Sequence, residues 1–299
     1  MQIGVIYPQT SMETDPGAVR HFAQAVEEMG FAHVLAFDHV VGANRASRPG
    51  VTLPYDLYST FHDPFVLFAF MAAHTRRIGF ATGVLVLAQR QAVLVAKQAA
   101  CVDVLSEGRL RLGVGTGWNA VEYEALGMDF ATRGRRMEEQ VEVMRKLWSE
   151  PAVTFRGQEH TVTDAGLAPM PVQQPIPVWF GGGSDRAMFG EKAKMSVLRR
   201  IARMGDGWIQ LPMPQDRSRE LIEVFHGLCR EYGRDPERIG IETRLELKLD
   251  EQPTWQDQIE GWRGMGVTHI SVSSANDRIK GVDAHLKRLE LFRQAAPAS

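Results

Sequence analysis

The sequence is poor in cysteine, because its 299 residues contain only Cys101 and Cys229. The two thiols lie far apart, without a CxxC pair or a Cys/His cluster, so neither a disulfide framework nor a zinc site is indicated. We expect two buried thiols within helices and no metal site.

The sequence also lacks an excess of either charge and any long apolar run. Lys and Arg number 34 against 36 Asp and Glu, which gives a net charge of −2. Nucleic-acid binders carry a basic excess that neutralises phosphates, and a membrane-spanning helix needs about 20 apolar residues. The first residues also lack the basic and apolar regions of a secretory signal. We therefore expect a cytoplasmic protein that binds neither nucleic acid nor membrane.

Short apolar runs alternate with amphipathic stretches along the chain, which is typical of βαβ units around a parallel sheet. Eight runs are expected as strands: Gln2 to Tyr7, His33 to Phe37, Ile78 to Thr82, Leu110 to Gly115, Val178 to Phe180, Gly207 to Gln210, Ile239 to Leu249 and Thr268 to Ser273. About as many helices separate them. Such barrels use about 200 to 400 residues. The sequence thus predicts an α/β fold, a (β/α)8 TIM barrel, with residues 1–299 as a single domain.

Two segments interrupt this repeat. Residues 151–176 are rich in proline and alternate like a β-hairpin, so we expect an insertion there. The helical region from Asn119 to Trp148 contains Gly127-Met128-Asp129, where we expect a break.

Two glycine-rich turns follow predicted strands. The first is Gly113-Val114-Gly115-Thr116-Gly117, and the second is Gly181-Gly182-Gly183-Ser184, directly before a helix. Free amides and a helix N-terminus at such junctions bind anions, and glycine lets a ligand approach the backbone. The first turn does not have the spacing of a dinucleotide-binding fingerprint. Each turn alone could be merely a tight connection, but two at one end of a barrel favour a phosphate site.

Two shorter motifs also end predicted strands. Asp38-His39 follows the second strand, and histidine titrates near neutrality while a neighbouring carboxylate can fix its tautomer. A lone histidine at this rim is about as often a structural hydrogen-bonding residue. Thr82-Gly83-Val84 follows the third strand, and a glycine between β-branched residues suggests a bulge or a strained peptide.

Taken together, these segments resemble the luciferase-like monooxygenase family, in particular its deazaflavin-dependent branch. The resemblance extends over nearly the whole chain. It is carried, in the family's order, by residues 82–87, 96–100, 103–109, 113–119, 133–139, 177–182 and 205–208.

The resemblance implies a homodimeric barrel that holds a cofactor across its strand ends, coenzyme F420 (a deazaflavin) or alternatively FMN, and acts on a small-molecule substrate. It implies that Gly83-Val84 is a non-prolyl cis peptide behind the cofactor ring, and that Asp38 and His39 are catalytic. The implied cofactor-binding residues are Thr82, Gly83, Val84, Gly115, Thr116, Gly117, Trp118, Gly181, Gly182, Gly183 and Ser184. Of these, Thr116 with Gly117 and Gly182 with Gly183 would hold the phosphate.

Two departures from the family pattern bear on function. Trp118 stands where sugar-phosphate dehydrogenases of the family carry a catalytic glutamate, which argues against sugar-phosphate oxidation. Residues 185–198 belong to a segment that is longer than the family's usual spacing. Its expected role is that of a lid, a dimer contact or a mobile segment. We expect an oxidoreductase that transfers a hydride between cofactor and substrate. An FMN-dependent monooxygenase, a flavin-binding relative without turnover and a non-redox barrel enzyme remain alternatives.

Overall fold

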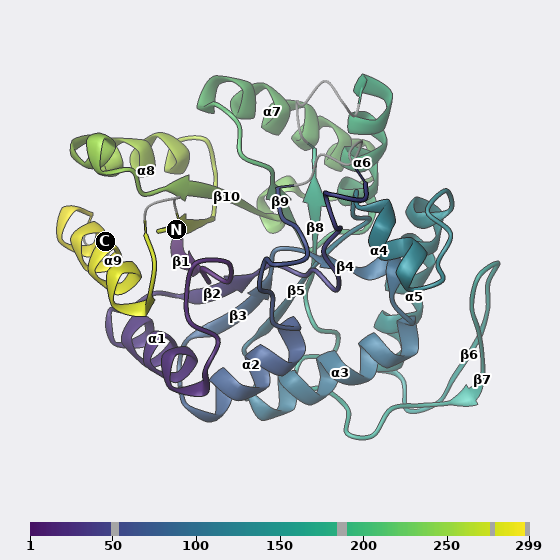
Figure 1. Cartoon of the computed structure of the whole chain (residues 1–299). Helices are drawn as coiled ribbons and strands as arrows, with labels where there is room; N and C mark the ends of the chain where they lie inside the picture. Colours follow the sequence, from purple (N-terminus) through teal and green to yellow (C-terminus); the bar gives the residue numbers. More distant parts are fainter. Residues whose placement is uncertain (49–53, 184–189, 276–278, 297–299) are drawn as a thin grey trace.

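The computed structural model describes residues 1–48, 54–183, 190–275 and 279–296 (Figure 1). The strands of its main sheet are β1 (Gln2–Ile6), β2 (His33–Ala36), β3 (Gly79–Thr82), β4 (Leu85–Val86), β5 (Leu110–Gly115), β8 (Val178–Gly182), β9 (Gly207–Gln210), β10 (Gly240–Glu246) and β11 (His269–Ser273). The helices are α1 (Pro16–Glu28), α2 (Pro64–Ala73), α3 (Ala92–Leu105), α4 (Ala120–Ala125), α5 (Arg133–Ser149), α6 (Gly190–Met204), α7 (Gln215–Glu231), α8 (Trp255–Arg263) and α9 (Val282–Ala295).

The main sheet closes on itself as a parallel barrel. Neighbouring strands follow the order β3-β2-β1-β11-β10-β9-β8-β5-β4, and β3 also pairs with β5. The two-residue strand β4 is an addition beside β5, so the closed circuit contains the predicted strands in the predicted order. Helices cover the outside of this circuit in Figure 1. The predicted (β/α)8 TIM barrel is therefore confirmed.

Local sequence signals explain where several helices begin and end. Asp63 Oδ1 accepts hydrogen bonds from the amides of Phe65 at 3.0 Å and Val66 at 3.3 Å, and Pro64 takes the first position of α2. This arrangement satisfies amides that have no partner inside the helix. The predicted break falls between α4 and α5, where Gly127 adopts a φ of +67°.

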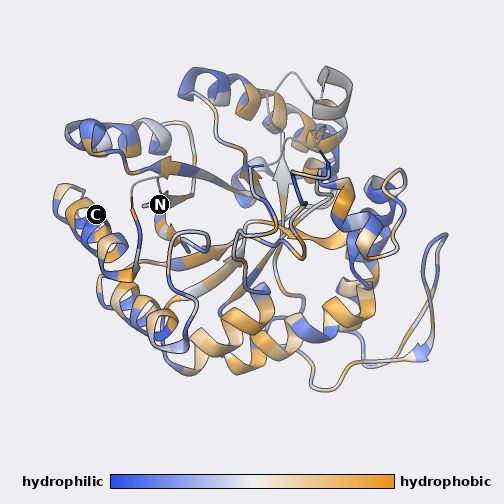
Figure 2. Ribbon diagram, viewed as in Figure 1, coloured by the Kyte–Doolittle hydropathy of each residue, from blue (hydrophilic) through white to orange (hydrophobic). Residues whose placement is uncertain are grey.

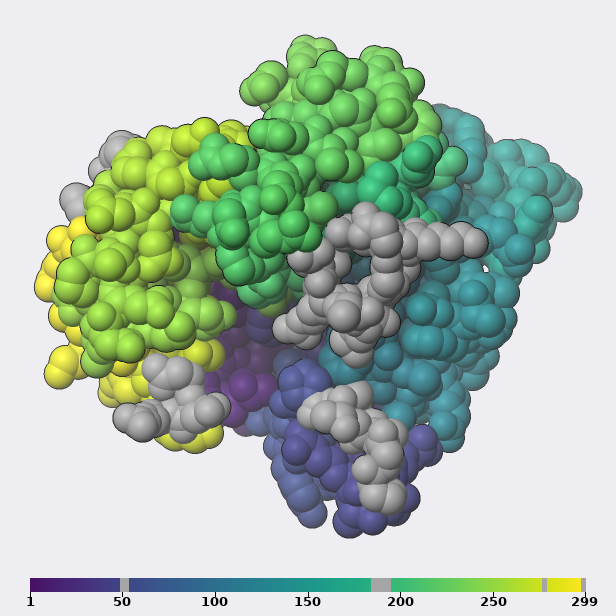
Figure 3. All heavy atoms as spheres, turned by 90° about the horizontal axis from the view of Figure 1, so that it is seen from above, coloured from purple at the N-terminus to yellow at the C-terminus, as the bar shows by residue number. Residues whose placement is uncertain are grey.

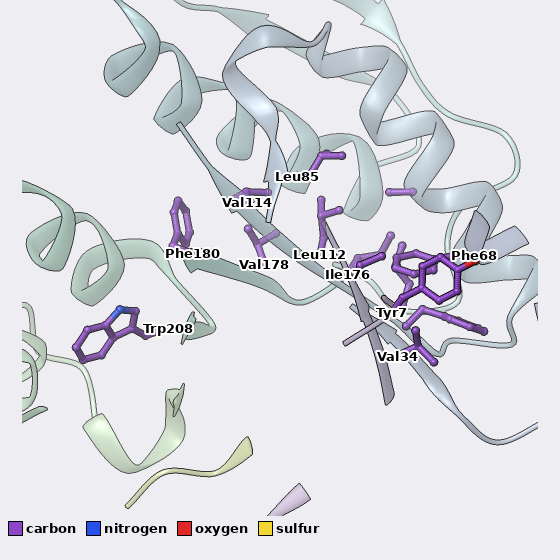
Figure 4. Close-up of a cluster of buried hydrophobic side chains, with 14 of the residues drawn as sticks. Tyr7, Val34, Phe68, Leu85, Leu112, Val114, Ile176, Val178, Phe180 and Trp208 are labelled. Carbon is purple, nitrogen blue, oxygen red and sulfur yellow. The ribbon is translucent and has the colours of Figure 1, made fainter. Parts of the chain in front are cut away.

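The main apolar core lies between the strands and the helices. Figure 4 shows Leu112 and Val114 of β5 beside Val178 and Phe180 of β8, all of them buried. Burying side chains of this size stabilises the fold by about 1.5 to 3 kcal/mol each. In Figure 2 the hydrophobic colour follows the inner faces of α1 and α7, while it extends over α2 and α3 more uniformly.

The inside of the barrel is filled by a polar layer and then an apolar one. Glu242 of β10 accepts a hydrogen bond from Ser271 at 2.6 Å, lies 2.9 Å from His33 Nε2 and pairs with Arg111 at 2.7 Å. Two residues further along β2 is Leu35, on the same face as His33 because side chains alternate. Leu35 packs in a small apolar cluster with Ile6, Ala81 and Phe37. This cluster lies between the polar layer and the carboxyl ends of β1, β2 and β3.

The predicted insertion is an antiparallel hairpin of β6 (Val153–Arg156) and β7 (Thr161–Ala165), which projects from the barrel in Figure 1.

Of the two cysteines, Cys229 in α7 is buried, whereas Cys101 in α3 is only partly buried, contrary to our expectation. In the described part of the chain, none of the helices has the length and apolar character that crossing a membrane requires.

Candidate functional site

The two glycine turns lie side by side at one end of the barrel. They follow β5 and β8, which are neighbouring parallel strands with Val114 opposite Phe180. Parallel neighbours end on the same side, and in (β/α)8 barrels the loops after the strands' carboxyl ends build the active site. The geometry on which the phosphate hypothesis depends is therefore present.

A single valine side chain fills the space between the two turns. A Cβ atom on Gly115 would lie 2.6 Å from Cγ2 of Val84, and a Cβ atom on Gly181 would lie 2.5 Å from its Cγ1. Carbon atoms do not approach so closely, so only glycine at both positions lets the two backbones contact Val84. The valine itself is partly exposed. We call Val84, Gly115 and Gly181 the glycine–valine platform.

The platform is held from below by side chains of the barrel interior. The peptide between Gly83 and Val84 is cis, as the resemblance implied. Arg244 of β10 donates a hydrogen bond through Nη2 to the carbonyl oxygen of Gly83 at 2.8 Å, and its guanidinium lies 4.6 Å from the centre of the Phe37 ring. Leu35 packs so closely under Gly83 that a Cβ atom there would lie 2.2 Å from the leucine Cδ2. The bulge therefore has contacts with both β2 and β10.

Hydrogen bonds from buried side chains fix the carbonyl groups of both turns. The hydroxyl of Tyr123 donates to the carbonyl oxygen of Thr116 at 2.6 Å. The indole of Trp208 donates to the carbonyl oxygen of Gly182 at 2.9 Å. Gly117 and Gly183, with φ values of +64° and +75°, adopt the left-handed conformation that favours glycine. Both turns therefore have a conformation that side-chain hydrogen bonds hold in place.

Two of the predicted cofactor-binding residues differ from the rest in their placement. Thr82 is completely buried, and its hydroxyl donates to the carbonyl oxygen of Gly113 at 2.6 Å. Its side chain therefore links β3 to β5, and only its backbone is placed near the platform. Ser184 lies outside the described residues, as do residues 185–189 of the segment expected to be longer than usual.

The carboxylate of Asp38 is bonded within the protein. Its Oδ1 lies 2.7 Å from Nη2 of Arg90, while Oδ2 accepts a hydrogen bond from the amide of Val86 at 2.9 Å. Burial raises the pKa of Asp38, and Arg90 and the Val86 amide oppose that effect. Because Val86 lies only two residues after Val84, Asp38 holds the chain that carries the platform.

His39 lies in a group of aromatic side chains from two loops, the one between β2 and α2 and the one after β5. Its ring centre is 3.8 Å from that of Tyr55, 4.7 Å from that of Phe61 and 6.3 Å from that of Trp118. Asn119 donates a hydrogen bond to the Tyr55 hydroxyl at 2.8 Å. Burial raises the pKa of Tyr55, so the phenol stays protonated. Trp118 is 38% exposed and directly follows Gly117 of the first glycine turn, and its ring lies near those of His39 and Tyr55.

Glu122 is a residue of this site that sequence reasoning missed. It is buried in the first turn of α4, where its Oε1 accepts a hydrogen bond from the amide of Val40 at 2.7 Å and lies 3.4 Å from Nδ1 of His39. The one signal in the sequence is Asn119 followed three residues later by Glu122, a pattern that normally marks a helix start. In such a box the glutamate turns back to its own helix, whereas here it reaches the loop after β2.

The residues at this end of the barrel fit a flat cofactor with an anionic tail. The platform presents the partly exposed side chain of Val84 between β5 and β8, and glycine at 115 and 181 keeps other side chains away from it. Seen from above in Figure 3, the molecular surface is hollowed between segments coloured green and purple. Among the described residues, no group of three or more His, Cys, Asp or Glu side chains could hold a metal ion.

Comparisons with known proteins show what the chain is similar to. The sequence profile of luciferase-like monooxygenases matches residues 1–262. An uncharacterized protein of Mycobacterium tuberculosis is 37% identical over 240 residues, which are 78% of this chain and 77% of that protein. The F420-dependent glucose-6-phosphate dehydrogenase of Kineococcus radiotolerans is 29% identical over 92% of this chain and 77% of its own. The crystal structure of the monooxygenase RslO1 from Streptomyces bottropensis superposes with a TM-score of 0.77, at 19% identity, over 99% of this chain and 98% of its own.

Proposed function

The chain belongs to the luciferase-like monooxygenase family, and we propose that it is an oxidoreductase that binds coenzyme F420 and transfers a hydride between this deazaflavin and a small organic substrate. The observation that carries the proposal is the glycine–valine platform, in which two glycine turns contact one partly exposed valine. A flat ring resting on Val84 would have the backbone of both turns within reach.

We assign the predicted cofactor residues to two tasks. Val84, Gly115, Gly181 and the backbone of Thr82 and Gly83 would support the ring, while Thr116, Gly117, Gly182 and Gly183, with Ser184, would bind the phosphate through backbone donors and hydroxyl groups. Trp118 would cover one side of the ring. Among the two residues predicted as catalytic, His39 would contact the substrate, and Asp38 would position the bulge through its bonds to Arg90 and Val86.

The choice of cofactor rests on the pattern of the central segment and on the Kineococcus relative, an F420-dependent enzyme. When bound, a deazaflavin supplies two-electron hydride chemistry, whereas reduced FMN also reacts with oxygen. An FMN-dependent monooxygenase is therefore the second candidate, and it is favoured by the likeness of the whole chain to the fold of a monooxygenase. A flavin-binding relative without turnover is the third candidate.

We propose a substrate other than a sugar phosphate. Trp118 occupies the position where the sugar-phosphate dehydrogenases of the family carry a catalytic glutamate, and its indole is 5.8 Å from the Tyr55 ring centre. The rings of His39, Tyr55, Phe61 and Trp118 present an apolar wall with few hydrogen-bonding groups. Such a wall favours a substrate with an apolar or aromatic part next to its reacting carbon.

We propose that a second copy of the chain covers the outer faces of α2 and α3. These helices pack against each other and expose Val66, Val93 and Leu94, with exposed fractions of 68%, 45% and 51%. Helices that are apolar on all sides are normally buried. Figure 2 shows this apolar colour along α2 and α3 at the outside of the barrel. Burial against the same face of a partner gives the symmetric contact of a homodimer.

The location and domain organisation also remain proposals. We place the protein in the cytoplasm because its cysteines are both unpaired, as is usual in reducing compartments. We propose that residues 1–299 form a single domain, which predicts one cooperative unfolding transition by calorimetry.

The proposed function is tested by adding coenzyme F420 and FMN separately to the purified protein and following fluorescence quenching. We expect tight binding of F420 and weak binding of FMN. Tight binding of FMN alone would replace the hydride-transfer proposal by the monooxygenase alternative. Binding of neither would remove the redox proposal.

A further inference from the structure

We propose that Glu122 is a positioning residue that sets the tautomer of His39, by keeping a proton on Nδ1 and leaving Nε2 as the nitrogen that meets the substrate. The assignment of a substrate contact to His39 rests on the proposed function. The tautomer itself is a property of the protein without any ligand, so it is tested separately.

The carboxylate and the imidazole face each other. Nδ1 of His39 is buried and has no regular hydrogen bond among the described residues, and Oε1 of Glu122 lies 3.4 Å away. This distance is longer than that of a good hydrogen bond, but contacts of this kind in enzymes commonly shorten when substrate binds. A carboxylate oxygen can only accept a hydrogen bond, so it favours the imidazole form that carries its proton on the facing nitrogen.

Neither group is free to move away from the other. The same Oε1 atom accepts a hydrogen bond from the amide of Val40 at 2.7 Å, which fixes the carboxylate beside the residue that follows His39. The imidazole lies 3.8 Å from the Tyr55 ring and 4.7 Å from the Phe61 ring, measured between ring centres. Its side chain is 16% exposed and that of Glu122 only 2%.

The other carboxylate close to His39 in the sequence is occupied. Asp38 precedes the histidine directly, but its two oxygen atoms bind Arg90 and the amide of Val86. The sequence therefore suggests the wrong carboxylate as the partner of this histidine. The structure brings the right one from α4, 83 positions further along the chain from His39 to Glu122.

The tautomer of His39 matters because oxidation of an alcohol releases a proton that needs an acceptor. When an alcohol carbon gives up its hydride to the cofactor, the hydroxyl proton must leave at the same time for a carbonyl to form. Nε2 without a proton accepts it, and the Glu122 carboxylate then stabilises the imidazolium from the Nδ1 side. In the reverse direction the carbonyl carbon receives the hydride, and the same nitrogen donates its proton to the carbonyl oxygen, which becomes the alcohol oxygen.

The experiment is a long-range 15N–1H NMR spectrum of the histidine rings, recorded without cofactor at a pH where the rings are neutral. The signals of His39 are assigned from their loss in His39→Gln. We expect wild-type protein to carry the proton mainly on Nδ1, although the isolated side chain in water prefers Nε2. Glu122→Leu should convert His39 mainly to the Nε2-protonated form.

Two further variants separate positioning from folding. Glu122→Gln should retain the Nδ1 proton, because its amide oxygen must still face the Val40 amide and so remains beside the ring. Glu124→Leu removes an exposed carboxylate of the same helix and should leave the His39 signals unchanged. A proton on Nε2 in wild-type protein, or the same tautomer in folded Glu122→Leu, would overturn the proposal. Neither result would bear on cofactor binding, which the fluorescence titrations measure.

Discussion

Replacing Gly115 by alanine tests the glycine–valine platform most directly. The added Cβ would lie 2.6 Å from Cγ2 of Val84, and that side chain cannot rotate away because its Cγ1 is already against Gly181. Valine is also restricted in χ1. Overpacking of this kind costs about 1 to 3 kcal/mol. At about 2 to 4 °C per kcal/mol for a large domain, we expect the Tm of Gly115→Ala to fall by about 2 to 12 °C.

The clash can also be relieved by shortening Val84, and the double variant with Gly115→Ala is the control of the test. Val84→Ala removes the atoms that the new Cβ would meet, and by itself should cost about 1 kcal/mol for a half-buried side chain that loses two methyl groups. The double variant should be more stable than the sum of the single effects predicts, by about 0.5 to 3 kcal/mol. Gly227→Ala, in α7 with nothing within 4 Å of the new Cβ, should not lower the Tm.

The assay combines calorimetry with the F420 titration on each variant. Gly115→Ala and the Val84→Ala variant should both bind F420 more weakly than wild-type protein, because either change alters the surface on which the ring would rest. Gly227→Ala should bind it normally. Strictly additive losses of Tm would refute the packing argument. Unchanged F420 affinity in both platform variants would refute the assignment of the ring to this surface.

Three other predictions concern charge and assembly. Asp38→Ala leaves Arg90 partly buried without its nearest carboxylate and should lower the free energy of unfolding by about 3 kcal/mol in a urea titration, with less than about 1 kcal/mol as the contrary result. Burial lowers the pKa of His269 to about 3. Between about pH 7 and pH 4 the unfolded ring therefore binds a proton that the folded ring does not, so stability should fall as the pH falls, and less steeply in His269→Gln. Parallel pH profiles for the two proteins would contradict this. Leu94→Glu should halve the molecular mass in light scattering if α2 and α3 form the homodimer contact, and an unchanged mass would place that contact elsewhere.

The order and type of the elements could be predicted because each depends on local pattern. Apolar runs and amphipathic stretches alternate along the whole chain, and Asp63-Pro64 and Gly127 mark helix boundaries by their own conformational preferences. The glycine turns could be placed at one end because parallel strands share a direction. These inferences need only neighbours in sequence and the general rules of barrels.

The details of the site depend on contacts between distant segments, which local pattern does not contain. Nothing in the sequence around Val84 indicates that its two methyl groups meet Gly115 and Gly181. Asp38 and His39 are adjacent in sequence, yet their side chains have different partners, Arg90 for the first and Glu122 for the second, and both partners lie far along the chain. Glu122 was missed because its local pattern indicates a helix start, while its contacts with Val40 and His39 lie in a distant segment.

The apolar cluster around Leu35 divides the titratable side chains inside the barrel into a set below it and a set at the mouth. Glu242, His33 and Arg111 form a charged cluster on the far side of the apolar layer that contains Leu35. Since that layer is apolar and closely packed, we expect protons and ligands at the mouth not to reach the cluster. On the mouth side of the layer, Glu122 lies behind His39, and the guanidinium of Arg244 is already bonded to the bulge. We therefore expect a proton that moves during hydride transfer to stay on the mouth side of this layer, where His39 lies, and the tautomer of this ring decides whether its Nε2 can accept that proton.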